Sequence, residues 1–241
     1  MRIAVVGRGR LGRTLAQLLP DAGIEVALVG RDLDLPPADA IVLAVPDRTI
    51  EKVAQSIPAP TAPVLHCSGA ATVDVLRPHA PAGSFHPLMT FPGPEVAIPP
   101  LAGVPAAIAG DPPALRIAEA LAVALGMRPV EVSGDRRLYH AAAVMAGNFA
   151  TVLLAEAARV LSAAGVDPAE APGMLAPLAL QSLRNAADDP VRALTGPAAR
   201  GDTAVIEAHL EAIASASLAE QHALYALLTR HAARIATKRD R

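Results

Sequence analysis

The sequence has few aromatic residues and no excess of positive charge. It contains three Phe, two Tyr and no Trp in 241 residues, and its formal net charge is −2. Proteins that bind nucleic acids or anionic membranes usually present a basic surface, and single strands also need aromatic rings on which bases stack. We therefore expect neither a nucleic-acid partner nor a membrane partner.

Cysteine and long apolar runs are also scarce. Cys67 is the only cysteine, which excludes an internal disulfide framework and is typical of a reducing compartment. The first ten residues, MRIAVVGRGR, are apolar only briefly and do not resemble a signal peptide. No continuous apolar run approaches the roughly 20 residues that span a bilayer. These features predict a soluble cytoplasmic protein.

Short apolar runs alternate with amphipathic segments in the first half of the sequence, as in βαβ units built on a parallel sheet. Most of these runs are nearly continuous Val, Ile, Leu and Ala, which is typical of strands covered on both faces. The predicted strands are 2–7, 25–30, 40–46, 62–68, 104–110 and 128–134, and the predicted helices between them are 10–20, 48–57, 72–77 and 113–125.

The composition changes after residue 134. Eighteen of the 23 prolines lie at or before Pro129, and the remainder is rich in alanine with helical periodicity. Residues 135–165 read as one long helix that ends at Gly165, and further helices are predicted at 169–187, 202–216 and 218–236. The sequence thus predicts an α/β fold, with a Rossmann-type, doubly wound parallel sheet over 1–134 and an all-α domain over 135–241.

A glycine-rich loop, GRGRLG, follows the first predicted strand and opens a predicted helix. Gly7, Gly9 and Gly12 match the spacing G-x-G-x-x-G in the context that dinucleotide-binding proteins require. The first glycine permits a tight turn, the second lets the backbone approach a pyrophosphate, and the third allows close helix–strand packing. Arg8 and Arg10 add charge that could contact the phosphates. A glycine turn with surface arginines is the alternative.

The end of the second predicted strand indicates which dinucleotide binds. NAD-binding proteins usually carry an acidic residue there, which holds the ribose 2′-hydroxyl. Here Gly30 leaves room, and the guanidinium of Arg31 matches a 2′-phosphate. Asp32 favours NAD instead, because it lies about 20 residues after the glycine loop, where the acidic residue of NAD-binding proteins is found. NADP is therefore favoured over NAD.

Two further loops follow predicted strands at the edge of the sheet where ligands of open α/β folds bind. The segment AVPD covers 44–47, and LHCSGA covers 65–70, with His66 and Ser68 as candidate substrate contacts. The complete set of predicted cofactor-binding residues is Gly7, Arg8, Gly9, Arg10, Leu11, Gly12, Gly30, Arg31, Ala44, Val45, Pro46 and Asp47.

Five motifs give the chain a family resemblance: GRGRLG, AVPD, HCSGA, SFHPLMTF at 84–91 and LTGPAARGD at 194–202. Together they resemble Rossmann-like oxidoreductases whose C-terminal helical domain has no known function. That group is similar to pyrroline-5-carboxylate reductases, ketopantoate reductases, β-hydroxyacid dehydrogenases and prephenate dehydrogenases. The resemblance covers nearly the whole chain. It implies an NADP-binding first domain, a helical dimerisation domain and an active site in the cleft between them.

The resemblance also identifies a missing catalytic residue. β-Hydroxyacid dehydrogenases place a catalytic lysine four residues before an asparagine on the first long helix of the helical domain. Asn148 matches that asparagine, but Val144 occupies the lysine position. The chain has only two lysines, Lys52 in the first domain and Lys238 in the tail, so the sequence argues against catalysis by a lysine acid.

Other polar residues are therefore the catalytic candidates. Asn148 is a poor helix-interior residue in an apolar stretch, and His140 shares its helix stripe as a possible proton donor. A hydrogen-bonded Asn and an exposed His are the structural alternatives. His86, in a predicted loop before Pro87, resembles the HP segment of prephenate dehydrogenases, and loop ordering is its alternative role.

The last candidates lie in the LTGPAARGD segment and around the cysteine. Arg200 could clamp a substrate carboxylate, whereas Asp202 fits the N-cap of the next helix. Cys67 reads as a small apolar residue rather than a nucleophile. No metal is expected, because the spacing of a four-ligand zinc site is absent.

These observations predict an NADP(H)-dependent oxidoreductase that acts on a small polar substrate with a C=N or C=O bond. Reduction of an already protonated imine is slightly preferred, because its carbon needs less electrophilic help. A non-catalytic NADP(H)-binding sensor or scaffold is the alternative. The apolar helices of the second domain further predict a homodimer.

Overall fold

The computed structural model describes residues 1–58, 61–93 and 96–237. The chain forms two compact units, Met1–Gly147 and Asn148–Arg241. The division between the units lies later than the boundary predicted near residue 134. The reason is that the first turns of the helix after residue 135 pack on the first unit, where Arg136 and Tyr139 have their contacts.

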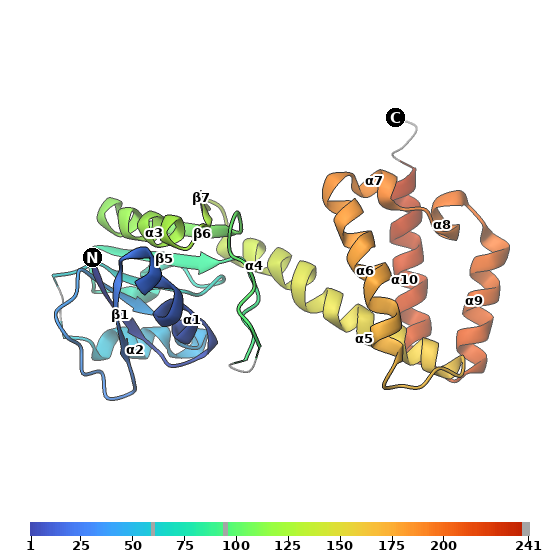
Figure 1. Cartoon of the computed structure of the whole chain (residues 1–241). Helices are drawn as coiled ribbons and strands as arrows, with labels where there is room; N and C mark the ends of the chain where they lie inside the picture. Colours follow the sequence, from blue (N-terminus) through green and yellow to red (C-terminus); the bar gives the residue numbers. More distant parts are fainter. Residues whose placement is uncertain (59–60, 94–95, 238–241) are drawn as a thin grey trace. The chain divides into compact units, whose positions relative to one another are not determined.

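A seven-stranded sheet forms the centre of the first unit (Figure 1), in the order β2-β1-β3-β4-β5-β6-β7. Neighbouring strands are parallel except β5 and β6, which are antiparallel. The direction in which successive strands are added reverses between β1 and β3, and such a switch point is where open α/β sheets bind ligands. The strands are β1 (Arg2–Val6), β2 (Glu25–Val29), β3 (Ala40–Leu43), β4 (Val64–His66), β5 (Ala82–Pro87), β6 (Pro105–Gly110) and β7 (Arg128–Glu131).

Strand β5 corrects the sequence prediction, which gave the residues around His86 to a loop. The segment AGSFHP is almost entirely buried and pairs with β4 on one side and β6 on the other. Its register places Phe85 opposite Ile108 and His86 opposite Ala107. With Gly, Ser, His and Pro in six residues, it lacks the continuous apolar run by which the other strands were recognised.

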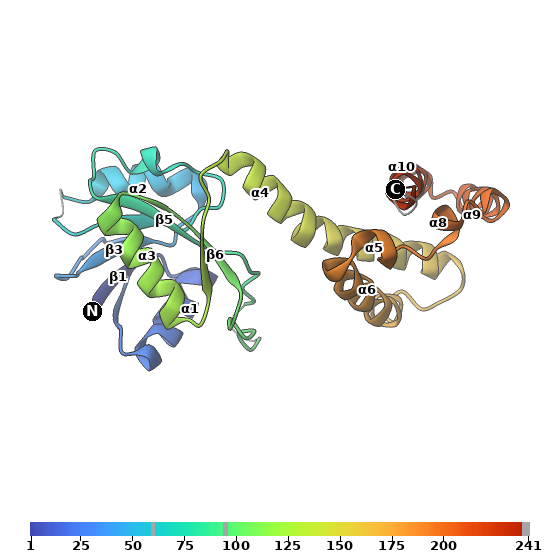
Figure 2. The same ribbon diagram turned by 90° about the horizontal axis from the view of Figure 1, so that it is seen from above.

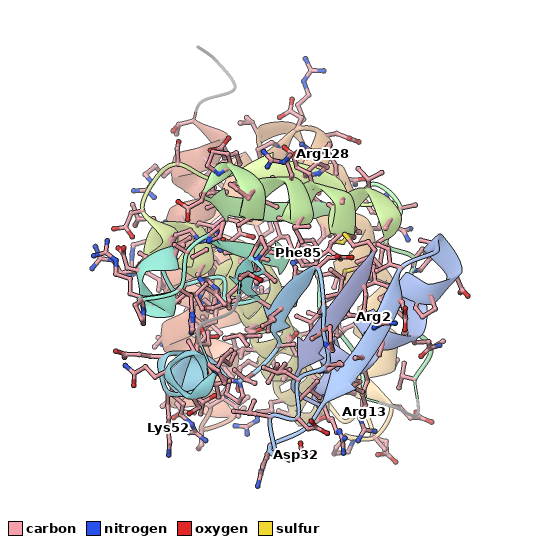
Figure 3. The ribbon with its side chains drawn as sticks, turned by 90° about the vertical axis from the view of Figure 1, so that its left-hand side faces the viewer. Arg2, Arg13, Asp32, Lys52, Phe85 and Arg128 are labelled. Carbon is pink, nitrogen blue, oxygen red and sulfur yellow. The ribbon has the colours of Figure 1, made fainter. Side chains whose placement is uncertain are left out.

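Helices cover both faces of the sheet, as Figure 2 shows for α1 and α3 on one side and α2 on the other. Leu15 and Ala118 join the larger core cluster, and Phe85 lies fully buried in it beneath α3 (Figure 3). Ile50 and Leu76 belong to the cluster on the opposite face. The helices are α1 (Arg10–Leu18), η1 (Leu19–Ala22), η2 (Asp47–Thr49), α2 (Ile50–Ser56), η3 (Val73–Leu76) and α3 (Pro112–Ala124), so the helix predicted at 72–77 is a 3-10 turn.

The predicted long helix over 135–165 contains a π-helical turn. Asp135 caps its start by accepting a hydrogen bond from the Arg137 amide, and Gly165 follows its end at a φ of +98°. Regular helix is interrupted because residues 145–149 form the π-helical turn η4, which hydrophobic periodicity does not reveal. The three parts are α4 (Arg136–Val144), η4 (Met145–Phe149) and α5 (Ala150–Ala163).

The second unit is entirely helical in its described part. Helix α5 packs against α6, and α10 packs against α7, α8 and α9 (Figure 1). Asp202 accepts a hydrogen bond from the Val205 amide, which confirms its predicted role as the N-cap of α9. The remaining helices are α6 (Ala171–Asp188), α7 (Pro190–Ala193), α8 (Pro197–Arg200), α9 (Thr203–Ser215) and α10 (Ala219–Ala236).

Many large apolar side chains of these helices face solvent. They include Met145, Phe149, Val152 and Leu153 before and in α5, and Met174, Leu178, Leu180 and Leu183 in α6. Arg136–Ala163 is the one described helix that is long and apolar enough, by length and composition, to cross a membrane. We expected no such segment because no run is continuously apolar, but its alanines raise the mean hydropathy to 1.5. A single helix of this kind is weak evidence for a membrane span.

Candidate functional site

The glycine loop after β1 is packed too tightly for side chains at two of its glycines. A Cβ on Gly7 would lie 2.3 Å from the Ala44 carbonyl oxygen, and a Cβ on Gly12 would lie 1.9 Å from the Gly7 carbonyl oxygen. Gly7 also has a φ of +120°, which side chains rarely adopt. Gly9 is different, because no atom lies within 4 Å of its Cβ position, and it forms the N-cap of α1 without a side chain. The loop therefore offers an open backbone surface at a helix N-terminus, and a diphosphate fits such a surface.

The end of β2 lies under the side chain of Arg8. A Cβ on Gly30 would lie 3.2 Å from Arg8 Cζ and 3.0 Å from Asp32 Oδ1. Arg8 and Arg31 are both exposed, so two guanidinium groups and one carboxylate flank this glycine. Arg8 thus joins Arg31 as a group that could bind a 2′-phosphate. The carboxylate of Asp32 still favours NAD, because it could accept a hydrogen bond from the ribose 2′-hydroxyl.

The loop after β3 connects the glycine loop to the loop after β4. The Ala44 amide donates to the Val6 carbonyl at 2.8 Å, which continues the pairing of β1 and β3. Three residues later, Asp47 accepts a hydrogen bond of 2.7 Å from the Ser68 hydroxyl. The predicted cofactor segment 44–47 therefore lies against both neighbouring loops, at the carboxyl edge of the parallel strands.

His66 and Ser68 hold the loop after β4 in place. His66 is fully buried, with Nε2 3.2 Å from the Thr72 carbonyl oxygen and Nδ1 3.2 Å from the Ser68 amide nitrogen. The Ser68 hydroxyl accepts hydrogen bonds from the amides of Ala70 and Ala71. Because their polar atoms are already engaged, these two residues position the loop, and the predicted contact of His66 with a substrate has no free nitrogen to use.

His86, Tyr139 and His140 form a cluster beside this loop. His86 Nδ1 lies 2.8 Å from the Tyr139 hydroxyl, and the imidazoles of His86 and His140 meet edge to face with their centroids 6.3 Å apart. Both imidazoles cover Gly69, where a Cβ would lie 2.7 Å from His140 Cδ2 and 3.0 Å from His86 Nε2. Three groups able to hold or move a proton are thus gathered at the sheet edge that carries the glycine loop.

Arg136 supplies a buried positive charge next to the cluster. Only 6% of the residue is exposed, and Nη2 donates to the Ser68 carbonyl at 2.9 Å. Its guanidinium carbon lies 5.0 Å from the centroid of the Tyr139 ring. Nε and Nη1 are buried and have no hydrogen-bond partner among the described residues.

Burial and this charge set the protonation states of the histidines. Burial first, and the Arg136 charge second, lower the pKa of both His66 and His86 to about 4. Both imidazoles are therefore neutral at pH 7. Burial raises the pKa of Cys67 to about 12, so this thiol is an apolar core group, as predicted. Within the described ranges, no three His, Cys, Asp or Glu side chains gather where they could hold a metal.

Two other predicted site residues, Asn148 and Arg200, belong to the second unit. Asn148 is exposed on the π-helical turn, as the first residue of the second unit. Arg200 ends α8 in the same unit, and its guanidinium donates to the Thr195 carbonyl. Lys52 projects into solvent from α2 (Figure 3), and Lys238 lies outside the described residues.

Sequence reasoning missed Arg136, Tyr139 and Gly69. A signal was available, because residues 136, 139 and 140 share one helix face at spacings of three and four.

The comparisons with known proteins address the fold. The model of the family described as "Domain of unknown function (DUF2520)" matches residues 104–232, which is more than half of the chain. A search of curated proteins finds no match.

Several solved structures are similar over nearly the whole chain. A protein from Thermotoga maritima has a TM-score of 0.78 at 24% identity and covers 99% of this chain and 100% of its own. A Bacteroides fragilis protein assigned as an NADP oxidoreductase has a TM-score of 0.79 at 24% identity, with 97% and 98% covered. A reductive aminase from Aspergillus terreus, in complex with NADPH and ethyl levulinate, has a TM-score of 0.67 at 16% identity, with 98% and 97% covered. These similarities confirm the expected Rossmann-type fold followed by a helical region.

Proposed function

The chain belongs to the DUF2520 family, and we propose that it is an NADP(H)-dependent oxidoreductase acting on a small polar substrate with a C=N or C=O bond. The observation that carries this proposal is the arrangement at one sheet edge. An open glycine loop at the N-terminus of α1 is linked, through Asp47 and Ser68, to a cluster of proton-holding side chains. A dinucleotide bound there would supply or accept the hydride at its nicotinamide ring.

NADP is the proposed cofactor because positive charge dominates the end of β2. Arg8 and Arg31 flank Gly30, where an NAD-binding protein usually carries an acidic residue. The Aspergillus neighbour bound to NADPH supports the same assignment. Asp32 supports NAD instead, so binding of both dinucleotides has to be measured.

The cluster of His86, Tyr139 and His140 is the proposed proton-handling site. Neutral His86 accepts a proton or a hydrogen bond through Nδ1, and the Tyr139 hydroxyl is the donor within reach. His140 and Asn148 are kept as further candidates for contact with the substrate. Gly69 lets both imidazoles approach the loop backbone, so the cluster depends on the absence of a side chain there.

A C=N bond is the preferred substrate group. No lysine lies in the cluster, and a protonated imine accepts hydride without the strong acid that a ketone requires. One structural neighbour is a reductive aminase, and reductive amination proceeds through reduction of a C=N bond.

The proposal is tested with purified protein and NADPH. Calorimetry should detect binding of NADPH, and a panel of imines and 2-oxo acids should show oxidation at 340 nm with at least one imine. His86→Ala should lower that turnover about a hundredfold, the typical effect of losing a positioned proton-transfer group, and leave NADPH affinity unchanged. A protein that binds NADPH but turns over no substrate would instead be a sensor or scaffold, and one that binds no dinucleotide would contradict both functions.

We further propose that the protein acts as a cytoplasmic homodimer. The exposed apolar side chains of α5 and α6 would leave a large apolar surface in water, and a second copy of the same helices covers it symmetrically. A hollow of about 600 Å³ in the second unit is lined mainly by apolar residues of α5, α8, α9 and α10, and Leu153 belongs both to its lining and to this surface.

A further inference from the structure

Arg136 is a buried cation without a counter-ion. No carboxylate of the described residues forms an ion pair with it, and a single carbonyl accepts one of its hydrogen bonds. Removing a guanidinium from water costs several kcal/mol unless charge and hydrogen bonds compensate. The carbonyl of Ser68 and the ring of Tyr139 compensate only in part.

One negative charge lies nearby, but among the described residues it forms no ion pair with Arg136. His66 and His86, the imidazoles on which the Arg136 charge acts, are neutral. Asp47, the carboxylate that also acts on them, is hydrogen-bonded to the Ser68 hydroxyl. Two nitrogens of Arg136, Nε and Nη1, remain with N–H groups to donate. This edge of the sheet is therefore built to favour an anion.

We infer that the substrate carries a carboxylate and that Arg136 binds it. This inference rests on the proposed function and narrows its substrate class to small imino or oxo acids. The Tyr139 ring covers the guanidinium, so the carboxylate reaches Nη1 as the ring turns aside, and a charge-assisted pair replaces the cation–π contact. The carboxylate then holds the reacting carbon beside His86, whose Nδ1 is released from the Tyr139 hydroxyl when that ring turns aside.

Arg136 takes the role that the sequence suggested for Arg200. The Arg200 guanidinium is exposed and caps its own turn at Thr195. Arg136 is buried, has unused donors and lies in the same unit as the His86 cluster. A buried cation discriminates charge more strongly than an exposed one, because water screens it less.

The chain offers a direct optical test, since it has no Trp and only two Tyr. In a Tyr225→Phe background, tyrosine fluorescence reports Tyr139 alone. We would titrate this protein, without dinucleotide, with lactate, with lactamide of the same size but no charge, and with inorganic phosphate. Lactate should change the fluorescence saturably, and lactamide and phosphate should not. In the same background Arg136→Gln should abolish the lactate response, and Arg136→Lys should weaken lactate binding by at least about tenfold.

Each outcome decides the matter. Equal responses to lactate and lactamide, or an unchanged response in Arg136→Gln, would overturn the inference, and an equal response to phosphate would overturn the assignment to a carboxylate. Circular dichroism checks folding, and Arg136→Lys retains a cation should the Gln variant fail to fold. Lactate binding without turnover of any substrate would contradict the proposed enzyme but not the anion site. Turnover of uncharged imines without lactate binding would contradict the anion site alone.

Discussion

At the scale of single residues, the proposed preference for NADP rests on Arg31, at the end of β2, and on Arg8, whose side chain reaches Gly30 from the loop after β1. Arg8→Ala and Arg31→Ala should each weaken NADPH binding roughly tenfold, because each removes one charge-assisted contact to a phosphate. NADH has no 2′-phosphate, so its affinity should stay the same. Calorimetry with both dinucleotides measures the effect. Arg128→Ala is the matched control, since β7 lies at the opposite edge of the sheet. Equal losses for NADPH and NADH would show that the arginines do not select the cofactor.

A substitution at Gly69 tests whether turnover depends on the positions of the His86 and His140 imidazoles. Gly69→Ala places a methyl group 2.7 Å from His140 Cδ2 and 3.0 Å from His86 Nε2, so both rings must shift. Turnover should fall by at least about tenfold while NADPH affinity is retained, because displaced catalytic groups lose their alignment. Gly134→Ala is the control, since its Cβ position is open. Turnover that survives in Gly69→Ala would remove His86 and His140 from the mechanism.

At the scale of elements, the stability that His66 gives to the connection between β4 and the following turn should depend on pH. The folded pKa of His66 is about 4, below the unfolded value of 6.5, so the unfolded chain binds the proton more readily. The contribution of His66 to the free energy of unfolding is therefore present above pH 6.5 and is lost as the pH falls toward 4, by about 2 kcal/mol between pH 7 and pH 5. Urea denaturation at both pH values measures the total loss, to which His86 contributes as well because its pKa is lowered in the same way.

His66→Gln separates that contribution from other titrating groups. The variant should be less stable than the parent at pH 7, because the bonds to Thr72 and Ser68 are disturbed. The difference between the two proteins should then shrink by about 2 kcal/mol at pH 5. A difference that does not change with pH would mean that His66 is not held neutral by burial.

The elements also show what a sequence can and cannot reveal. Strands β1, β3 and β4 were predictable because fully covered strands are nearly continuous apolar runs. Strand β5 was not, because the pairing of β4 and β6 on either side makes AGSFHP a strand, and pairing is a property of distant residues. The π-helical turn escaped for a similar reason, since periodicity fixes the apolar face of a helix but not its hydrogen-bond spacing.

In the candidate site, too, some features depend on local sequence and others on contacts between distant residues. The glycine loop could be read locally, because its function depends on backbone that only glycine leaves open. For Arg136 and Tyr139, helical spacing shows only that they share a face with His140, and it does not show burial, because an arginine at a helix start is usually solvated. What distinguishes Arg136 is burial against the Ser68 loop, 68 residues earlier in the chain.

At the scale of the whole molecule, the homodimer should depend on the apolar side chains of α6. Leu178 is 67% exposed, and Leu178→Glu would place a charge in the proposed interface. We expect the dissociation constant to rise at least about a hundredfold, because an unpaired buried charge is strongly unfavourable. Sedimentation velocity measures the assembly. Val123→Glu, at an equally exposed apolar position on α3, should leave it unchanged. A wild-type protein that sediments as a monomer would contradict the proposal.

The hydrogen bond between Asp47 and Ser68 limits which substitutions these two positions can accept during evolution. The serine hydroxyl donates to one carboxylate and accepts from two backbone amides, so its loss alone leaves three groups without their partner. A part-buried amide left without an acceptor costs more than the bond it once made, so losing the serine is the more costly of the two changes. Positions 47 and 68 should therefore covary among orthologues. A survey of orthologous sequences should find few in which only one of the two residues differs.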